Sequence, residues 1–180
     1  MTILRNAIQT CGRLNEECCK ISKDCEISIK NREDHLKDRH ISIPIGKFNI
    51  AIDDINADLI NLYNELKDKP DEFISDARKL FVPLNNDPDV YYDYRKQFNA
   101  SNDAYERAIL FLYMNRHGYN GLCRYNKKGR FNVPFGKYKR PYFPANELYF
   151  FSDKSQKATF TCLNYTELFK LIPDNAVVYC

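Results

Sequence analysis

The sequence predicts an α/β protein in which a small sheet is interrupted by a second module of helices and loops. Apolar runs typical of buried strands lie near both ends of the segment 47–180, and helical periodicity fills much of the chain between them. A basic segment rich in Gly and Asn follows the last of these central helices. Strand and helix units at both ends, with an insert between them, indicate this fold class.

The first half of this segment is expected to form one strand and two helices. Lys47–Asp54 has the pattern of a short buried strand that ends in carboxylates. Asn56 is a suitable N-cap, and residues 55–67 carry apolar side chains at helical spacing. Residues 70–81 are expected to form a second helix that starts at a proline, and 82–89 a loop because they are rich in Pro, Asn and Asp.

The second half is expected to contain four helices and two strands. Asp103–Arg116 has the clearest helical pattern in the chain, with Ala104, Ala108 and Leu112 on one face. The other expected elements are helices at 90–98, 146–154 and 166–171 and strands at 158–162 and 176–179. Residues 1–45 mix charges and cysteines without a sustained period, and no element is assigned to them.

Asn115–Phe143 is the most informative stretch of the chain. Its 29 residues hold eight Lys or Arg, no Asp or Glu, seven aromatic residues and four of the chain's six glycines. Cations attract phosphate groups, aromatic rings stack on bases or insert between them, and glycine turns let the backbone approach a duplex. A single Arg would be read as a solvated surface charge, but this composition predicts a nucleic acid as the partner.

Charge and composition limit the remaining classes of function. The net charge is only +3, but eight carboxylates lie in Asp53–Asp76, so charge is segregated in a way that steers a polyanion to one face. With 44% hydrophobic residues in 180, the chain can bury the core of one domain or slightly more. No apolar run has the length of a membrane span and the N-terminus lacks a signal-peptide core, so we expect no membrane and a cytoplasmic location.

The seven cysteines and three histidines do not predict a metal site. Four cysteines crowd the first 25 residues without a C-x2-C pair, so free thiols in a reducing compartment are favoured over a zinc site. The histidines have no metal-ligand spacing with cysteines or acids, and the chain contains no P-loop. We therefore expect no metal.

Polar residues after two of the expected strands are candidates for binding a nucleotide-like cofactor. Asp53 and Asp54 end the first strand, where a carboxylate in an α/β fold commonly accepts hydrogen bonds from ribose hydroxyls. The alternative is that one of them caps the next helix. Asn164 and Tyr165 follow a later strand, where an aromatic ring can stack on adenine, although the pattern at Tyr165 taken alone favours a buried core residue.

A tight turn bracketed by two glycines is expected to project Tyr119 and Asn120 from the basic segment. A projecting ring can insert between base pairs, and Arg124 can read guanine O6 and N7 with two hydrogen bonds. The alternative is that Tyr119 or Leu122 belongs to the core.

One long pattern is specific enough to indicate a family. The stretch RAILFLYMNRHGYNGLCRYNKKGRFNVPFGKYKRPYFPANEL closely resembles the target-recognition region of Dam-type DNA adenine methyltransferases, the D12 class. The resemblance covers about residues 47–180, from DDINADLINLYN through KLFVP to NAVVYC. It implies a partial Rossmann-like methyltransferase sheet within a partial methyltransferase (cofactor) domain formed by 46–68 and 156–180. A helical and β-hairpin target-recognition domain is inserted at 69–155, and residues 1–45 lie outside the resemblance.

The resemblance implies that methyl groups pass from S-adenosylmethionine to adenine N6 in duplex DNA, at a GATC-like site and with the target base flipped out of the stack. The cofactor-binding positions are then Asp54, Asn164 and Tyr165. The positions that wedge at the flipped base or read bases are Tyr119, Asn120, Leu122, Arg124 and Pro134. Further contacts to DNA fall at Asn126, Asn132, Lys137, Tyr138 and Lys139, with Arg95 and Arg116 as weaker phosphate contacts. We expect a monomer that binds double-stranded DNA.

The chain also departs from the family's pattern. No G-x-G sequence precedes Asp54, where the family has a glycine-rich loop for the methionine end of the cofactor, and no D-P-P-Y follows VVYC. Because D-P-P-Y carries the catalytic Asp and Tyr, no catalytic residue is assigned in this chain. We expect a truncated methyltransferase with a foreign or misread N-terminus, and no turnover by the isolated 180 residues. The alternatives are a DNA-binding module without methyl transfer and a non-functional remnant.

Overall fold

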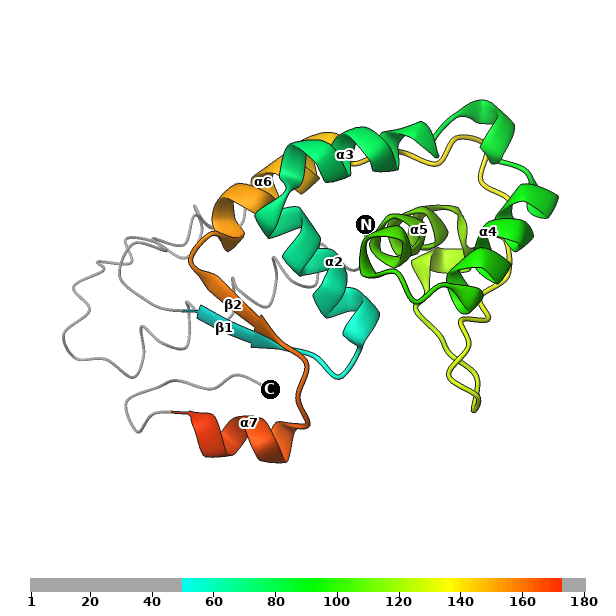
Figure 1. Cartoon of the computed structure of the whole chain (residues 1–180). Coiled ribbons are helices and arrows are strands. Elements are labelled where there is room, and N and C mark those ends of the chain that lie inside the picture. Colours follow the sequence, from blue (N-terminus) through cyan, green and yellow to red (C-terminus); the bar gives the residue numbers. More distant parts are fainter. Residues whose placement is uncertain (1–49, 173–180) are drawn as a thin grey trace, which may run out of the picture.

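A computed structural model describes residues 50–172 as a set of helices packed against a small parallel sheet. Strands β1 (Ile50–Asp53) and β2 (Ala158–Thr161) pair in parallel, in register from Ile50 with Ala158 to Asp53 with Thr161. Parallel neighbours need a long crossover connection, and here the whole intervening segment supplies it. Figure 1 shows the two strands side by side at one end of the molecule and helices α4 and α5 at the other.

Helix α2 (Ala57–Asp68) connects the sheet to the other helices. Asn56 is its N-cap, as predicted, and the Asn56 side chain accepts hydrogen bonds from the backbone N–H groups of Asp58 at 3.1 Å and Leu59 at 3.4 Å. Because a capping residue itself is not helical, the helix begins at residue 57 and not at residue 55. One face of α2 is buried against its neighbours and carries Ile60, Leu62, Tyr63 and Leu66.

The central helices agree closely with the sequence pattern. They are α3 (Pro70–Lys79), the 3-10 turn η3 (Pro83–Asn85), α4 (Pro88–Ala100) and α5 (Ala104–His117). Helix α4 is longer than the predicted 90–98, because Asp87 caps it through the N–H of Asp89 and because Pro88 suits the first helical position. Helix α5 begins after Asp103, whose carboxylate accepts the N–H of Glu106 at 2.7 Å, and all residues from 110 to 115 are buried.

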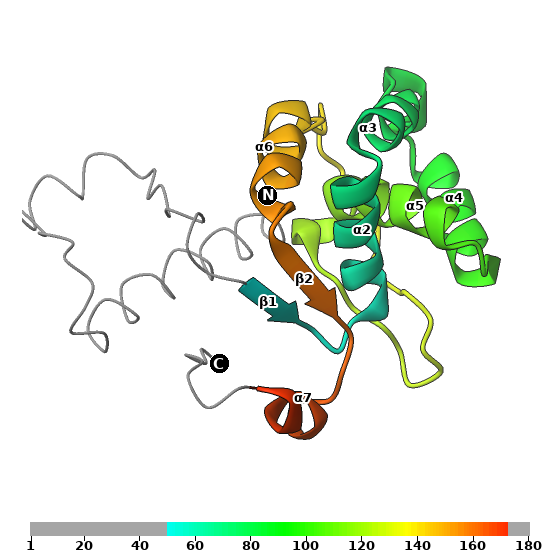
Figure 2. The same ribbon diagram turned by 60° about the vertical axis from the view of Figure 1, so that its left-hand side comes forward.

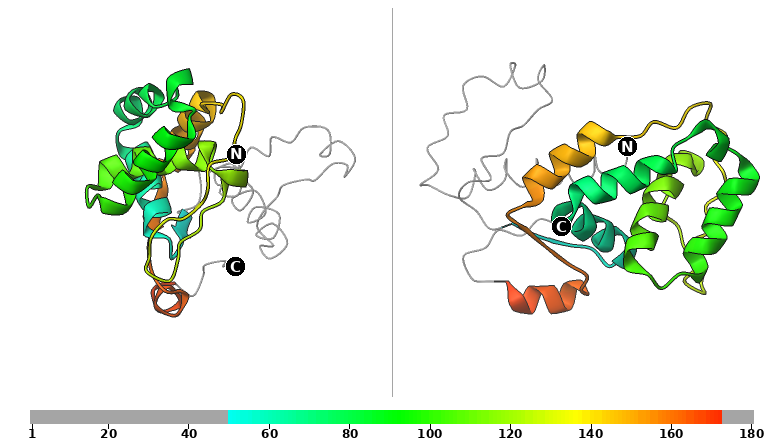
Figure 3. Two further views of the ribbon diagram at one scale, coloured as in Figure 1. Left: turned by 90° about the vertical axis from the view of Figure 1, so that its right-hand side faces the viewer. Right: turned by 45° about the horizontal axis from the view of Figure 1, so that its top comes forward.

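Helices α6 (Ala145–Ser155) and α7 (Tyr165–Leu171) complete the described part of the chain. The right-hand view of Figure 3 shows α6 alongside α3. Helix α7 buries none of its residues and lies beyond the sheet, away from α3 to α5, in Figures 1 and 2. No helix between residues 50 and 172 is both long and apolar enough to cross a membrane.

One hydrophobic core runs from α2 to β2. The ring centroid of Tyr63 on α2 lies 4.9 Å from that of Phe151 on α6 and 5.3 Å from that of Phe160 on β2. The core is therefore continuous across the boundary predicted between residues 46–68 and 69–155, and the division into domains stays a prediction. The expected strand at 176–179 and the unassigned residues 1–45 lie outside the described residues.

Candidate nucleic-acid interface

Residues 118–140, here called the basic arm, follow α5, and part of this segment projects beyond the helices (Figure 1, yellow-green). The sequence predicts a β-hairpin in this region. The arm instead has two isolated antiparallel bridges, between Gly118 and Phe135 and between Tyr125 and Phe131, and a 3-10 turn η4 (Tyr119–Gly121). A continuous ladder is absent because the two sides of the arm differ in length between the bridges: residues 119–124, which include η4, face only residues 132–134.

Helix α4 holds that returning segment with three polar side chains one helical turn apart, Tyr91, Arg95 and Asn99. Asn99 pairs with the backbone of Phe131 in both directions, donating to its carbonyl at 3.0 Å and accepting its N–H at 2.8 Å. The Tyr91 hydroxyl and the Arg95 Nη1 donate to the carbonyl of Val133, at 3.1 and 2.9 Å. These contacts fix the position of the arm on the helices, and sequence reasoning missed Tyr91 and Asn99. The available signal was that Tyr91, Arg95 and Asn99 are spaced four residues apart, which places all three on one face of the helix.

Arg95 and Arg116, the two weaker phosphate candidates, are both engaged with the protein itself. The Arg95 guanidinium donates to the arm and lies 4.6 Å from the ring centre of Tyr92. Arg116 donates from Nε to the carbonyl of Tyr142 at 2.9 Å, and its guanidinium lies over the ring of Tyr142. Burial lowers the pKa of Arg116. Both side chains therefore help to hold the structure, and phosphate contact through their other donors stays a prediction.

The predicted base-contacting side chains lie on the open surface of the arm. Tyr119 is 51% exposed and Leu122 is 42% exposed, so the alternative that either belongs to the core is wrong. The Arg124 guanidinium donates to the side-chain oxygen of Asn132 at 2.8 Å and to its carbonyl at 3.2 Å, which fixes its direction. The other exposed members of the predicted set are Asn120, Asn126, Pro134, Lys137, Tyr138 and Lys139, and Asn132 is half-buried.

Two turns of the arm are joined where the Tyr119 turn meets the Lys137 turn. Asn120 and Lys137 both have positive φ, at 53° and 55°. The N–H of Asn120 donates to the hydroxyl of Tyr138 at 2.9 Å. A Cβ on Gly136 would lie 2.5 Å from the Tyr138 ring and 2.9 Å from the Gly118 carbonyl oxygen, so only glycine allows this approach.

Two Asn side chains outside the arm also donate hydrogen bonds to the Tyr119 turn and the Lys137 turn. Asn115, which is 6% exposed, donates to the carbonyl of Gly121 at 2.7 Å. Asn86 donates to the carbonyl of Tyr138 at 2.7 Å. Sequence reasoning missed both residues, although an Asn in the apolar run of α5 was a signal for Asn115.

The carboxyl ends of the two parallel strands form a second candidate site. Asp53 accepts hydrogen bonds from the Thr161 hydroxyl at 2.7 Å and the Leu163 N–H at 2.9 Å, and so ties the two strand ends together. Asp54 is half-buried and accepts the N–H of Asn56 at 2.7 Å. The alternative that one of these acids caps α2 is wrong, because Asn56 is the cap.

Asn164 and Tyr165 follow β2 and therefore lie near the same edge of the sheet as Asp54. The Asn164 side chain caps α7 by accepting from the N–H and the hydroxyl of Thr166, at 3.0 and 2.9 Å. Tyr165 is 68% exposed, so its interpretation as a buried core residue is wrong. A half-buried carboxylate and an exposed ring at one strand edge are groups that suit a ribose and an adenine.

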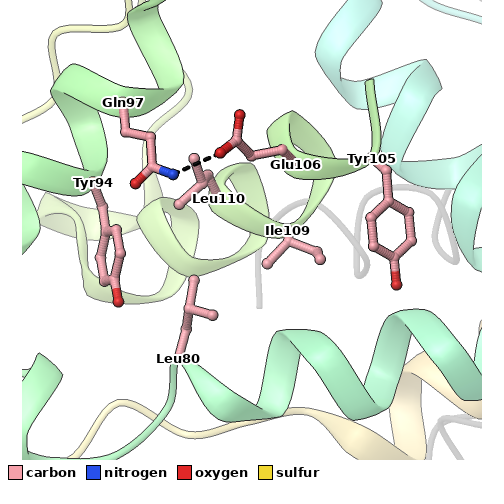
Figure 4. Close-up of a pocket in the computed structure, with 7 residues that line it drawn as sticks. All are labelled: Leu80, Tyr94, Gln97, Tyr105, Glu106, Ile109 and Leu110. Carbon is pink, nitrogen blue, oxygen red and sulfur yellow. Dashed lines mark hydrogen bonds between the residues drawn. The ribbon is translucent and has the colours of Figure 1, made fainter. Parts of the chain in front are cut away.

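Among residues 50–172 no metal cluster forms at either site, and a pocket in the helical part contains none of their residues. Between residues 50 and 172 no group of three or more His, Cys, Asp or Glu is placed to hold a metal ion, and the four N-terminal cysteines lie outside this range. A pocket of about 230 Å³ lies between α3, α4 and α5, with Leu80, Tyr94 and Ile109 in its wall (Figure 4). None of the predicted site residues lines it, so the basic arm and the strand edge remain the two candidate sites.

These features define an α/β protein with a projecting basic surface suited to a polyanion. Comparison with known proteins gives the family: residues 47–180 match the family of D12 class N6 adenine-specific DNA methyltransferases, and the chain belongs to that family. The resemblance seen in the sequence is thereby confirmed.

The relatives extend beyond the region that this chain shares with them. Proteins named DNA adenine methylase from Vibrio cholerae, Escherichia coli and Salmonella typhi are 60%, 57% and 54% identical to it over 127 residues. The matched region is 71% of this chain and 46% of each of these relatives. The chain thus spans about half the length of the curated relatives it matches.

Proposed function

We propose that this chain supplies the DNA-reading surface and part of the cofactor edge of an S-adenosylmethionine-dependent methyltransferase that acts on adenine N6 at a GATC-like site. The observation that carries the proposal is the sorting of side chains on the basic arm. Its Lys and Arg residues are all exposed, namely Arg124, Lys127, Lys128, Arg130, Lys137, Lys139 and Arg140, and it contains no Asp or Glu. Its backbone is anchored to α4 and α5, so these charges are presented on a fixed frame.

Base reading falls to the exposed side chains whose directions are set by the arm. Arg124 is held by Asn132 in one direction, and a pre-set guanidinium loses little freedom when it binds guanine O6 and N7. Leu122 and Pro134 offer apolar contacts of the kind that pack on a thymine methyl. We assign Tyr119, which is exposed, and Asn120 to the wedge at the flipped base.

Phosphate contacts position the duplex and carry no sequence information. We assign them to Lys137, Lys139 and Tyr138 on one turn and to Asn126 and Asn132 on the other part of the arm.

We assign cofactor binding to the strand edge. There Asp54 would accept hydrogen bonds from ribose hydroxyls, and Tyr165 beside Asn164 would stack on the adenine. S-adenosylmethionine supplies the methyl group when it is bound. This chain contributes the carboxylate and the exposed ring that orient such a molecule at the edge of the sheet.

A binding titration tests the proposal. Fluorescence anisotropy with a labelled 20-base-pair duplex is expected to show one chain per duplex and a preference for GATC over AATC. If about five phosphates are neutralised, log affinity falls with log salt at a slope of roughly −4 to −5. A flat salt response would refute DNA binding. Incubation of the same samples with methyl-labelled cofactor separates an enzyme from a DNA-binding module without methyl transfer.

A further inference from the structure

A carboxylate at the start of α2 contacts the basic arm across the molecule. Asp58 lies in the first turn of α2, and its side chain is 13% exposed. Its Oδ2 accepts a hydrogen bond from the hydroxyl of Tyr125 at 2.6 Å, and 67 residues separate the two in the chain. Its Oδ1 accepts from Nε and Nη2 of Arg107, at 2.9 and 2.7 Å.

Arg107 holds this carboxylate in place. From α5 its Nη1 donates to the carbonyls of Phe98 at 2.7 Å and Ser101 at 3.0 Å, at the end of α4. Its guanidinium also lies 4.1 Å from the ring centre of Phe98. With Arg107 fixed on two helices, the Asp58 carboxylate has little freedom to move, and it offers the arm a rigid acceptor.

Tyr125 connects the Asp58 carboxylate to the segment of the arm that carries Arg124. It is half-buried, pairs with Phe131 in a bridge and meets the Phe131 ring edge-on at 5.6 Å. Side chains alternate in direction along an extended segment, so an inward Tyr125 directs Arg124 and Asn126 outward. The hydroxyl bond to Asp58 fixes how far the segment can slide along its own direction.

The turn that contains Asp58 also reaches the carboxyl end of β1. The Asn56 side chain accepts the N–H of Asp58 at 3.1 Å, and Asp54 accepts the N–H of Asn56 at 2.7 Å. The carboxylate assigned to the cofactor and the acceptor that holds the arm therefore belong to one short hydrogen-bonded turn.

We infer that Asp58 and Tyr125 are positioning residues for base recognition, which set the register of the Arg124 segment against α2. The inference rests on the proposed function, because it assigns how the same surface reads its site. Neither residue contacts DNA: each acts through Arg124.

The test is the removal of one hydroxyl group. Tyr125→Phe in the full 180-residue chain is expected to reduce the preference for a GATC over an AATC duplex by about tenfold. Affinity for the AATC duplex and the salt slope should stay as in the unaltered protein, because no cation is lost. Tyr105→Phe is the matched control, since Tyr105 also donates to a carboxylate, that of Asp76 at 3.0 Å, between α5 and α3.

A double-mutant cycle distinguishes positioning from simple stabilisation. In an Arg124→Ala background, Tyr125→Phe should have little further effect on the preference, because the side chain that it positions is gone. Additive losses would overturn the inference, and so would equal loss of preference in Tyr105→Phe.

The outcomes also separate the inference from the proposal beneath it. If the unaltered chain does not prefer GATC over AATC, the proposed function fails and the inference fails with it. If the unaltered chain prefers GATC and Tyr125→Phe keeps that preference, only the inference is overturned.

Discussion

His117, the last residue of α5, makes the stability of this protein dependent on pH. Its ring is stacked on that of Tyr113 at 3.9 Å and lies 5.0 Å from that of Phe81, and the residue is 1% exposed. Burial lowers the pKa of His117 from 6.5 to about 4, against the opposing effect of its hydrogen bond with the Tyr113 carbonyl. The imidazole is therefore neutral in the folded protein at pH values where the unfolded chain is protonated.

The sign and size of the effect follow from this difference. Between pH 6.5 and pH 4 the unfolded chain binds a proton that the folded chain does not, so the free energy of unfolding falls as the pH falls. A pKa difference of one is equivalent to about 1.4 kcal/mol. The loss is then about 2 kcal/mol between pH 7.5 and 5, and about 3 kcal/mol by pH 4.

Urea unfolding followed by circular dichroism at several pH values between 7.5 and 5 measures this loss. The comparison protein is His117→Phe, which keeps an aromatic ring beside Tyr113 but cannot titrate. The difference in stability between pH 7.5 and 5 should be about 2 kcal/mol smaller in the variant than in the unaltered protein. Other titrating groups contribute equally to both and cancel.

Equal pH dependence in the two proteins would refute the reasoning, as would an NMR titration that places the pKa of His117 near 6.5. His117 also lies where the basic arm returns to α5, because its carbonyl accepts the N–H of Gly136 at 2.8 Å.

Three further predictions concern the arm. Arg124→Ala is expected to lower the preference for a duplex with the site's guanine by about 1–3 kcal/mol in anisotropy titrations, and an unchanged preference would remove Arg124 from base reading. Gly136→Ala places a methyl group 2.5 Å from a ring carbon of Tyr138, so urea unfolding should show a loss of about 1–3 kcal/mol. Asn99→Ala removes both hydrogen bonds to the backbone of Phe131 and should speed amide exchange at Phe131 in NMR, whereas unchanged protection would show that the clamp on the arm is dispensable.

The sequence alone determined the local elements and the family. Asn56 caps α2 where the pattern places it, because a cap depends only on residues within one turn. Asp103 was expected as the first residue of its helix and is its N-cap instead. The apolar spacing of α2 predicted its buried face for the same reason. It did not predict that of α5, where Ala104 is exposed and all residues from 110 to 115 are buried. The long pattern around the basic arm carries the family, since its residue types are read directly from the chain.

Only the tertiary structure decided which polar groups act on one another. Nothing near Asp58 in the chain predicts that it accepts a hydrogen bond from Tyr125. The composition of the basic segment does not show that Arg116 is half-buried and bonded to the Tyr142 carbonyl while Arg124 is exposed. The predicted hairpin forms only two isolated bridges, because η4 adds residues to one side of the arm between them. Partners of this kind depend on how helices pack across the core, and a local pattern fixes the face of a helix but not the neighbour that meets it.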